Sequence, residues 1–266
     1  MRELPPRFLA GMIALAPLPG SPRYEGSAAE VRARALDDLA AYAGAGVDIV
    51  VLENSHDVPY VKPPFHAEAL ALVTDIAGEV RARFEGPVGI QLLEAANLDA
   101  MRVAASCDLD LVRVEGYVFA HVGGAGLVEG CAGDLLRLRR ELRADDVRVF
   151  GDLHKKHCSH AITGDLDILD ELRQAEFFDV DGVIVTGDRT EVPPDPTEVA
   201  AVSAASRVPV LVGSGMTPEN IADYMPHADG FIVGSCLRVD GRFMERLAPE
   251  RLERFVGAFR EARAGA

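Results

Sequence analysis

The sequence predicts an α/β protein, a (β/α)₈ barrel, because eight short apolar runs alternate with longer amphipathic stretches along 266 residues. About 250 residues is the usual size of such a barrel. The apolar runs are rich in Val, Ile and Leu, as strands buried on both faces of a parallel sheet should be. Apolar residues make up 48% of the chain, which is enough for a sizeable core. No linker or change of composition interrupts the chain, so we expect one domain over residues 1–266.

We expect the strands, in chain order, at Gly11–Ala16, Val47–Glu53, Val88–Leu93, Leu109–Glu115, Val147–Leu153, Gly182–Thr186, Val208–Gly213 and Gly230–Gly234. Right-handed crossovers join such β-then-α units into a parallel sheet, and eight units close into a barrel. A doubly wound open sheet is the weaker alternative, because no G-x-G-x-x-G fingerprint follows the first strand.

Helix boundaries can be predicted from capping residues. Ser27 with Glu30 forms a capping box that opens the first helix. Asp195-Pro196 and Thr217-Pro218 each place a capping residue before a proline at the first helical position. The last helix is expected over about Pro249–Ala262.

The net charge of −15 disfavours nucleic acid as a partner, because an acidic surface repels phosphate backbones. No apolar run approaches the ~20 residues of a membrane span, and we expect no signal peptide. The four cysteines are widely spaced and contain no C-x-x-C pair, so we expect neither a zinc finger nor a disulfide framework. The cytoplasm is the expected location, and a homo-oligomer is left open.

Three of the expected strands end in carboxylates. In barrels the chemistry lies at the carboxyl ends of the strands, so Glu53, Glu115 and Asp152 are our catalytic candidates. Period-two alternation turns Gln91 and Arg113 toward the same mouth, where we expect them to bind substrate. Neighbouring carboxylates shift each other's pKa, which separates an acid from a base. Two alternatives remain: Arg113 in a buried ion pair that plugs the barrel, or Mg²⁺ held by Glu115 and Asp152.

Lysine usage is also informative, because the 27 basic residues comprise 24 arginines and only three lysines, at positions 62, 155 and 156. Unlike a guanidinium, an ammonium can lose its proton and act as an acid, a base or a Schiff-base nucleophile. We predict that Lys156 is catalytic.

Histidines follow the expected strands in the same way. His56, His121 and His154 are predicted to orient substrate hydroxyls or move protons. The H-x-x-H-x-x-H spacing from His154 fits no zinc motif. Thr186, at the end of its strand, is a further substrate-binding candidate.

The last quarter of the chain contains two glycine turns, and we predict that Gly213, Ser214, Gly215, Gly234 and Ser235 bind phosphate. Glycines allow backbone N–H groups to approach an anion, and a helix N-terminus favours negative charge. The loops after strands seven and eight are the recurrent phosphate site of many barrels. The sequence thus predicts a barrel of the phosphate-binding type.

Taken together, these motifs resemble the BtpA/SgcQ family, named for a factor in photosystem I biogenesis and a carbohydrate-operon protein. The resemblance spans nearly the whole chain, although Ala14 stands where the family often has His. The matching stretches are residues 18–23, 53–60, 113–121, 131–134, 155–161, 181–187 and 213–220.

The resemblance implies a phosphate-binding barrel without settling the reaction. We expect an enzyme, a lyase, an isomerase or a glycosyl-phosphate-processing enzyme, acting on a small phosphorylated metabolite such as a sugar phosphate or a nucleotide-related compound. The alternative is a non-catalytic assembly or regulatory factor like the photosystem I biogenesis protein, because fold alone does not separate the two.

Overall fold

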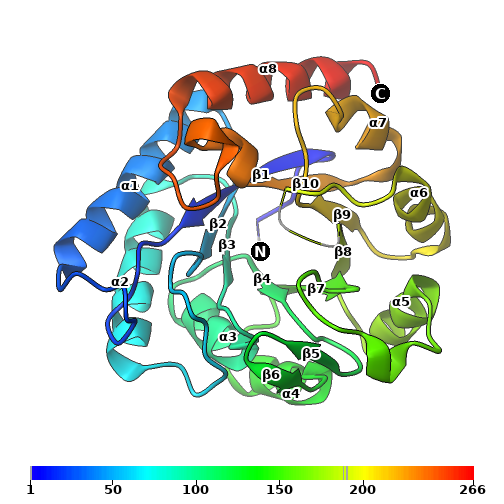
Figure 1. The fold of residues 1–266 in the computed structure, drawn as a ribbon, viewed down its shortest axis with the longest axis horizontal. Coiled ribbons are helices and arrows are strands. Elements are labelled where there is room, and N and C mark those ends of the chain that lie inside the picture. Colours follow the sequence, from blue (N-terminus) through cyan, green and yellow to red (C-terminus); the bar gives the residue numbers. More distant parts are fainter. Residues whose placement is uncertain (1, 188, 190) are drawn as a thin grey trace.

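Eight parallel strands close into a barrel within the part of the chain that the computed structural model describes, residues 2–187, 189 and 191–266 (Figure 1). Neighbours along the chain are neighbours in the barrel, and β1 closes the ring by pairing with both β2 and β10. The barrel strands are β1 (Phe8–Ala14), β2 (Ile49–Glu53), β3 (Val88–Gln91), β4 (Leu111–Val114), β7 (Arg148–Leu153), β8 (Gly182–Thr186), β9 (Val210–Gly213) and β10 (Gly230–Val233).

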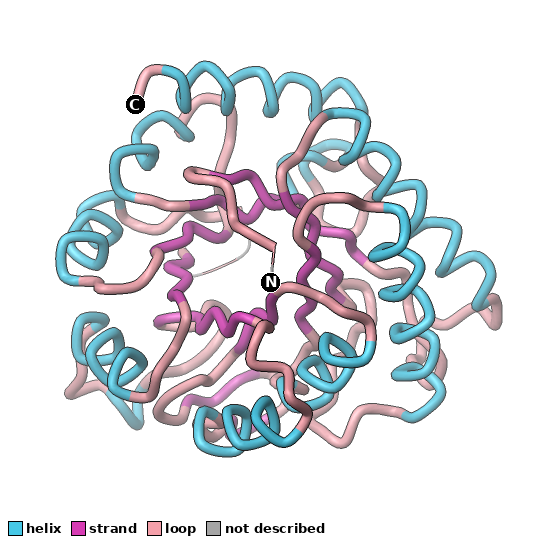
Figure 2. Tube along the Cα trace, turned by 180° about the vertical axis from the view of Figure 1, so that it is seen from behind, coloured by secondary structure: helices cyan, strands magenta, loops and turns pink. Residues whose placement is uncertain are grey.

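Helices surround the ring of strands (Figure 2). They are α1 (Ala28–Ala45), α2 (Ala67–Arg83), α3 (Asn97–Ser106), α4 (Ala132–Glu141), α5 (Ile168–Phe177), α6 (Pro196–Ala205), α7 (Ile221–Tyr224) and α8 (Pro249–Ala264). Short 3₁₀ turns include η1 (Ala161–Thr163) and η3 (Ser235–Leu237). None of the described helices is both long enough and apolar enough to cross a membrane.

The predicted barrel is confirmed, with strand ends shifted by up to three residues. β1 begins at Phe8 rather than Gly11, because Phe8 to Gly11 pair with β10. Ser27 caps α1 by accepting a hydrogen bond from the Glu30 amide at 3.1 Å. Asp195 caps α6 in the same way, accepting from the Thr197 amide at 2.8 Å.

The prediction that Thr217-Pro218 opens a helix is wrong. The Thr217 amide donates to Asn220 Oδ1 at 2.8 Å, which folds residues 218–220 into a turn. The helix begins only at Ile221 and is four residues long. A helix N-terminus is therefore not available to bind an anion beside the glycine loop.

A β-hairpin that the sequence analysis did not predict follows β4. Its strands β5 (His121–Gly123) and β6 (Gly126–Val128) are antiparallel (Figure 1), and β5 lies against η1. The hairpin is tied to three barrel loops. Val122 and Ser159 exchange two backbone hydrogen bonds, Lys62 Nζ donates to Leu127 O at 3.0 Å, and Glu94 Oε2 accepts from the Ala125 amide at 2.8 Å.

Inward-facing apolar side chains fill the barrel below its mouth, and Leu4 of the N-terminal segment packs against them. The period-two prediction for β2 is confirmed, because Ile49 and Val51 belong to this interior cluster. Glycines make room for large neighbours in the same layers: an ideal Cβ at Gly182 would lie 2.2 Å from Phe150 Cε1. The interior cluster comprises Phe8, Ala10, Met12, Ile49, Val51, Leu111, Phe150, Ile184, Leu211 and Ile232.

We predict that Gly182→Ala destabilises the barrel, because the added methyl group collides with the buried Phe150 ring. Overpacking of this kind costs roughly 1–3 kcal/mol. The melting temperature should fall by about 2–4 °C for each kcal/mol. The control is Gly257→Ala on α8, where an added Cβ meets no atom within 4 Å. A Gly182 variant as stable as the control would contradict this account of the interior.

Candidate functional site

A ring of buried polar side chains covers the apolar interior at the carboxyl ends of the strands. Glu53, Gln91, Arg113, Asp152 and Thr186 come from five different strands, and each is at most 8% exposed. The register places Glu53 opposite Gln91 on adjacent strands. The structure therefore brings these five predicted residues together at the mouth of the barrel.

Arg113 and Asp152 form a bidentate ion pair inside this ring. Arg113 Nε donates to Asp152 Oδ1 at 2.8 Å, and Nη2 donates to Oδ2 at 3.0 Å. Burial alone would lower the pKa of Arg113, but the charge of Asp152 and its hydrogen bonds outweigh burial and raise it. Both oxygens of Asp152 are thus engaged by one guanidinium.

Glu115 has a different cationic partner. Lys155 Nζ lies 3.0 Å from Glu115 Oε1, and the Ala95 amide donates to Oε2 at 3.0 Å. Burial raises the pKa of Glu115, and Lys155 opposes that shift. Burial would lower the pKa of Lys155, yet Glu115 and other nearby acidic groups raise it.

Of the two alternatives left open by the sequence, the structure contains the buried ion pair of Arg113, with Asp152 as its partner. Two cations of the protein itself, Lys155 and Arg113, neutralise the two carboxylates separately. Since all four carboxylate oxygens already accept hydrogen bonds or contact a cation, this pair does not fit a Mg²⁺ site. Among the described residues no group of three His, Cys, Asp or Glu side chains is arranged to hold a metal ion.

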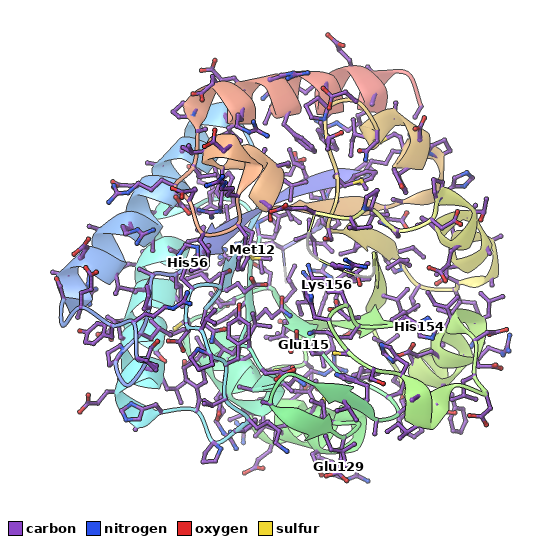
Figure 3. All side chains as sticks on the ribbon, viewed as in Figure 1. Met12, His56, Glu115, Glu129, His154 and Lys156 are labelled. Atoms are coloured by element: carbon purple, nitrogen blue, oxygen red, sulfur yellow. The ribbon has the colours of Figure 1, made fainter. Side chains whose placement is uncertain are left out.

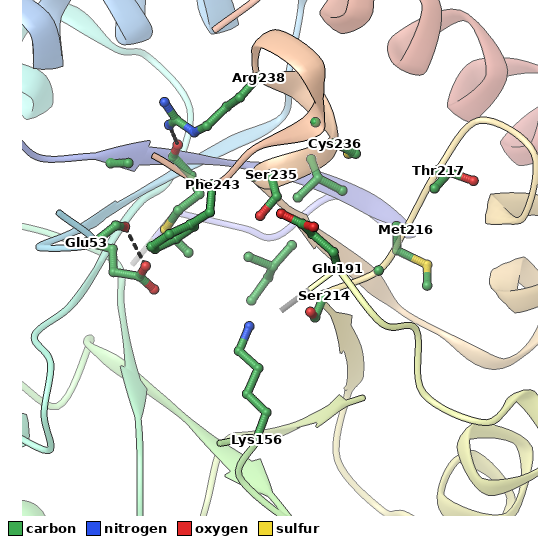
Figure 4. A pocket seen from close by; sticks show the side chains of 18 of the residues that line it. Glu53, Lys156, Glu191, Ser214, Met216, Thr217, Ser235, Cys236, Arg238 and Phe243 are labelled. Atoms are coloured by element: carbon green, nitrogen blue, oxygen red, sulfur yellow. Dashed lines mark hydrogen bonds between the residues drawn. The ribbon is translucent and has the colours of Figure 1, made fainter. Parts of the chain in front are cut away.

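Lys156 differs from its neighbour. Its side chain extends into the mouth of the barrel (Figure 4), where Nζ makes no hydrogen bond or ion pair with any described residue. Burial lowers its pKa to about 8, and the nearby charge of Arg113 acts in the same direction. Two adjacent lysines thus have pKa values shifted in opposite directions.

The mouth contains two connected cavities that share Glu53, Arg113, Lys156 and Phe243 as a common wall. The first, which we call the β9–β10 lobe, has a volume of about 210 Å³. The second, the β3–β4 lobe, has a volume of about 370 Å³. The β9–β10 lobe is further lined by Ala14, Glu191, residues 214–217, residues 234–236, Arg238 and Arg251, and the β3–β4 lobe by Tyr60, Gln91, Glu94, Glu115 and Lys155.

The two predicted phosphate loops line the same lobe, because Ser214, Gly215, Gly234 and Ser235 all border the β9–β10 cavity. The backbone N–H groups of Gly215 and Met216 donate to no described residue. Packing also requires two of the glycines. A Cβ at Gly215 would lie 2.1 Å from Pro193 N, and one at Gly213 would lie 3.1 Å from Ile184 Cγ2.

His56 lies on the other side of Phe243 from the mouth. Its Nε2 contacts the Phe243 carbonyl oxygen at 3.2 Å, and the ring meets the Phe243 ring edge-on. Burial lowers the pKa of His56 to about 4, so the ring is neutral at pH 7. It lines a separate cavity of about 530 Å³ with Arg23 and Arg34.

His121 and His154 also lie outside the two lobes. With His160 and Glu171 they line a small pocket, in which the His160 ring centroid is 5.6 Å from that of His121 and 5.1 Å from that of His154. Burial lowers the pKa of His121 to about 4. His154 has φ of 43°, which ends the period-two alternation, so its side chain does not follow Asp152 into the mouth (Figure 3).

Two polar atoms at the mouth are buried without a partner in the described structure, Gln91 Oε1 and Thr186 Oγ1. Such atoms are costly unless a ligand or water satisfies them. Sequence reasoning missed Glu94, Glu191, Arg238, Phe243 and Arg251, which also line the lobes. Four of them lie in loops or irregular segments, where no period indicates which way a side chain points, and Arg251 lies in the first turn of α8.

The architecture is that of a TIM barrel, and solved barrels share it at low sequence identity. N-(5′-phosphoribosyl)anthranilate isomerase from Pyrococcus furiosus aligns with a TM-score of 0.58 and 13% identity, covering 96% of this chain and 99% of that chain. 7,8-Dihydropteroate synthase from Vibrio fischeri aligns with a TM-score of 0.59 and 13% identity, covering 99% and 94%. Likeness at this identity shows the fold alone.

The chain belongs to the BtpA family, whose model matches residues 6–261, and this confirms the resemblance predicted from the motifs. An uncharacterised mitochondrial protein of Caenorhabditis elegans is 38% identical over 92% of this chain and 90% of its own length. The photosystem I biogenesis protein BtpA of Synechocystis is 32% identical, over 94% of this chain and 87% of its own length.

We predict that Asp152→Asn destabilises the protein by about 3–5 kcal/mol, because it leaves the buried Arg113 guanidinium without a carboxylate. Thermal or urea unfolding measures the loss. The control is Asp145→Asn, which removes an exposed pairing with Arg140 and should change stability by less than about 1 kcal/mol. Equal stabilities of the two variants would show that the Arg113–Asp152 pair is not a structural element of the mouth.

We also predict that Lys156 titrates near pH 8, well below Lys155. Because the chain has only three lysines, ¹³C-methyl labelling gives few resonances, and Lys156→Arg assigns the one of interest. Below pH 8 the Lys156 amine is charged, and above it the amine is neutral and nucleophilic. A resonance that titrates at the ordinary lysine value would show that the mouth does not desolvate this amine.

Proposed function

We propose that this protein is an enzyme that acts on a small phosphorylated metabolite, a sugar phosphate or a nucleotide-related compound. The phosphate occupies the β9–β10 lobe, and the reacting carbon lies beside Lys156 and Glu53. The observation that carries the proposal is Lys156, whose amine lies at the junction of two cavities without a partner among the described residues, with its pKa lowered to about 8. Catalytic groups need a pKa close to the working pH, and such shifts concentrate at functional sites.

Phosphate binding is supported by the donors that border the β9–β10 lobe. The N–H groups of Gly215 and Met216, which donate to no described residue, and the hydroxyl of Ser235 supply neutral donors. The Ser214 hydroxyl already donates to the Arg189 carbonyl oxygen at 3.3 Å. Arg251 adds positive charge, and its Nε donates to the Cys236 carbonyl oxygen at 2.8 Å, which holds the guanidinium at the rim. Charge-assisted hydrogen bonds of this kind are the stronger ones for anions.

Acid–base chemistry is supported by Glu53 and Lys156, which line both lobes of the mouth. Glu53 Oε1 accepts a hydrogen bond from Ser55 Oγ at 2.5 Å, which orients its carboxylate beside the common wall of the lobes. Glu53 acts as the base, and Lys156 acts as the acid, the electrophile or the Schiff-base amine. Enolisation, aldol or retro-aldol cleavage, and glycosyl–phosphate chemistry all use this pair, so the class is a lyase, an isomerase or a glycosyl-phosphate-processing enzyme.

In this proposal Glu115 and Asp152 are positioning residues. Glu115 holds Lys155, and Asp152 holds Arg113, so the charges around Lys156 are set before a ligand arrives. Fixed charges that need no rearrangement during the reaction stabilise a transition state more effectively than mobile ones.

The alternative is a non-catalytic assembly factor. The Synechocystis relative is named for such a role, in photosystem I biogenesis. Binding scaffolds do not require a desolvated amine without a partner, whereas a catalytic acid or nucleophile does. Lys156 therefore favours the enzyme.

The test of the phosphate lobe compares Ser235→Asp with Ser235→Asn, which differ in charge and little in shape. Titration with inorganic phosphate and a set of sugar phosphates should show binding to the wild type and the Asn variant. A loss of at least roughly tenfold in the Asp variant is expected from like-charge repulsion. Equal affinities of all three proteins for these ligands would refute the assignment of the β9–β10 lobe as the phosphate site.

The catalytic part of the proposal is tested by measuring turnover of the phosphorylated compounds that bind. Lys156→Gln should retain the fold and phosphate binding but lose turnover, since Gln has no titrating amine. Borohydride trapping with carbonyl substrates separates a Schiff base from an acid role. A binding protein with no turnover, whose ligand affinity is unchanged by Lys156→Gln, would support the assembly factor instead.

A further inference from the structure

Glu94 is a buried carboxylate that the sequence analysis passed over. It lies just beyond β3, is 5% exposed and lines the β3–β4 lobe. Its Oε2 accepts a hydrogen bond from the Ala125 amide of the hairpin at 2.8 Å. Its Oε1 accepts no hydrogen bond from any described residue. One oxygen is therefore anchored, and the other is left for a ligand.

The charges of the β3–β4 lobe do not balance. Arg113 is neutralised by Asp152, and Lys155 is neutralised by Glu115. The remaining Asp, Glu, Lys and Arg side chains that line this lobe are two carboxylates, Glu53 and Glu94, and one ammonium, Lys156. The β3–β4 lobe therefore carries an excess of negative charge and of hydrogen-bond acceptors.

The two lobes thus differ in chemistry. The β9–β10 lobe presents backbone N–H groups, the Ser235 hydroxyl and the guanidinium groups of Arg238 and Arg251, which suit an anion and offset the carboxylates of Glu53 and Glu191 in its lining. The β3–β4 lobe presents carboxylates, which accept hydrogen bonds from hydroxyls and repel a second anion. An acidic side chain that binds sugar hydroxyls in this way is known from dinucleotide-binding folds.

We propose that Glu94 contacts hydroxyl groups at the non-phosphate end of the ligand and selects a sugar monophosphate over a sugar bisphosphate. This inference rests on the proposed function and specifies the substrate class at the same site. Glu94 is a specificity-determining residue: Oε1 accepts from the sugar, and its charge excludes a second phosphate.

The hairpin positions this carboxylate. An ideal Cβ at Gly123 would lie 2.0 Å from Glu94 Oε1, so the carboxylate rests directly against the glycine backbone of β5. Gly123→Ala therefore moves the Glu94 side chain without removing its charge. The hairpin and the carboxylate form one unit, although their residues are separated by about thirty positions in the chain.

The experiment uses inorganic phosphate, fructose 6-phosphate and fructose 1,6-bisphosphate as probes of the full-length protein. Glu94→Gln keeps an acceptor for the Ala125 amide but removes the charge. Glu129→Gln is the matched control, because Glu129 follows the same hairpin but is exposed and lies away from the mouth (Figure 3). Calorimetric titration gives the affinity of each protein for each probe.

We expect the wild type and Glu129→Gln to bind the monophosphate more tightly than the bisphosphate. Glu94→Gln should weaken monophosphate binding by roughly tenfold, the typical loss for a charged hydrogen-bond partner, and should reduce the preference over the bisphosphate. Inorganic phosphate should bind all three proteins equally. Gly123→Ala should reproduce the monophosphate loss of Glu94→Gln.

Two results overturn the inference, and they are distinguishable. If the wild type binds none of the probes, the phosphate lobe itself is refuted, and the proposed function falls with it. If phosphate binds but Glu94→Gln keeps the wild-type preference for the monophosphate, the phosphate lobe stands and the role of Glu94 is refuted. Wild-type behaviour of Gly123→Ala alone would refute the positioning by the hairpin.

Discussion

The bidentate ion pair between Arg113 and Asp152 is the interaction on which the mouth of this barrel depends. The interior below it is apolar, so a charge at this depth is tolerated only with a partner of good geometry. The pair engages both oxygens of Asp152 and so ties this carboxylate to a structural partner. Its remaining effect is electrostatic: the Arg113 charge helps to keep the neighbouring Lys156 amine below its ordinary pKa.

A second pair, Lys155 with Glu115, neutralises another carboxylate at the mouth. The two adjacent lysines consequently differ, since Lys155 pairs with a carboxylate and Lys156 extends into the cavity. Because their surroundings shift the pKa values of the two lysines in opposite directions, one site contains both a fixed cation and an amine that titrates. Glu53, oriented by Ser55, is the carboxylate that lies with this amine at the wall common to both lobes.

The loops divide the mouth and decide which side chains reach it. Phe243 separates the central lobes from the cavity that contains His56, and the left-handed backbone at His154 turns that side chain toward His160 and Glu171. The β5–β6 hairpin brings the backbone of residues 123–125 against Glu94. The β9–β10 lobe and the β3–β4 lobe, with the Lys156 amine between them, are therefore assembled from segments that are far apart in the chain.

By itself the sequence determined the barrel, the order of its strands and the inward-facing positions, because alternation along a strand dictates which face each residue occupies. Glu53, Gln91, Arg113, Glu115 and Asp152 were predicted at the mouth from alternation and from their places at the ends of strands, and the structure places them there. Only the tertiary structure decided that Asp152 pairs with Arg113 and Glu115 with Lys155, since partners across strands depend on register and on loop conformation. The same holds for the hairpin, for Glu94 and for the displaced histidines. Loop residues have no periodicity from which their direction can be read, so their positions are set by contacts with distant parts of the chain.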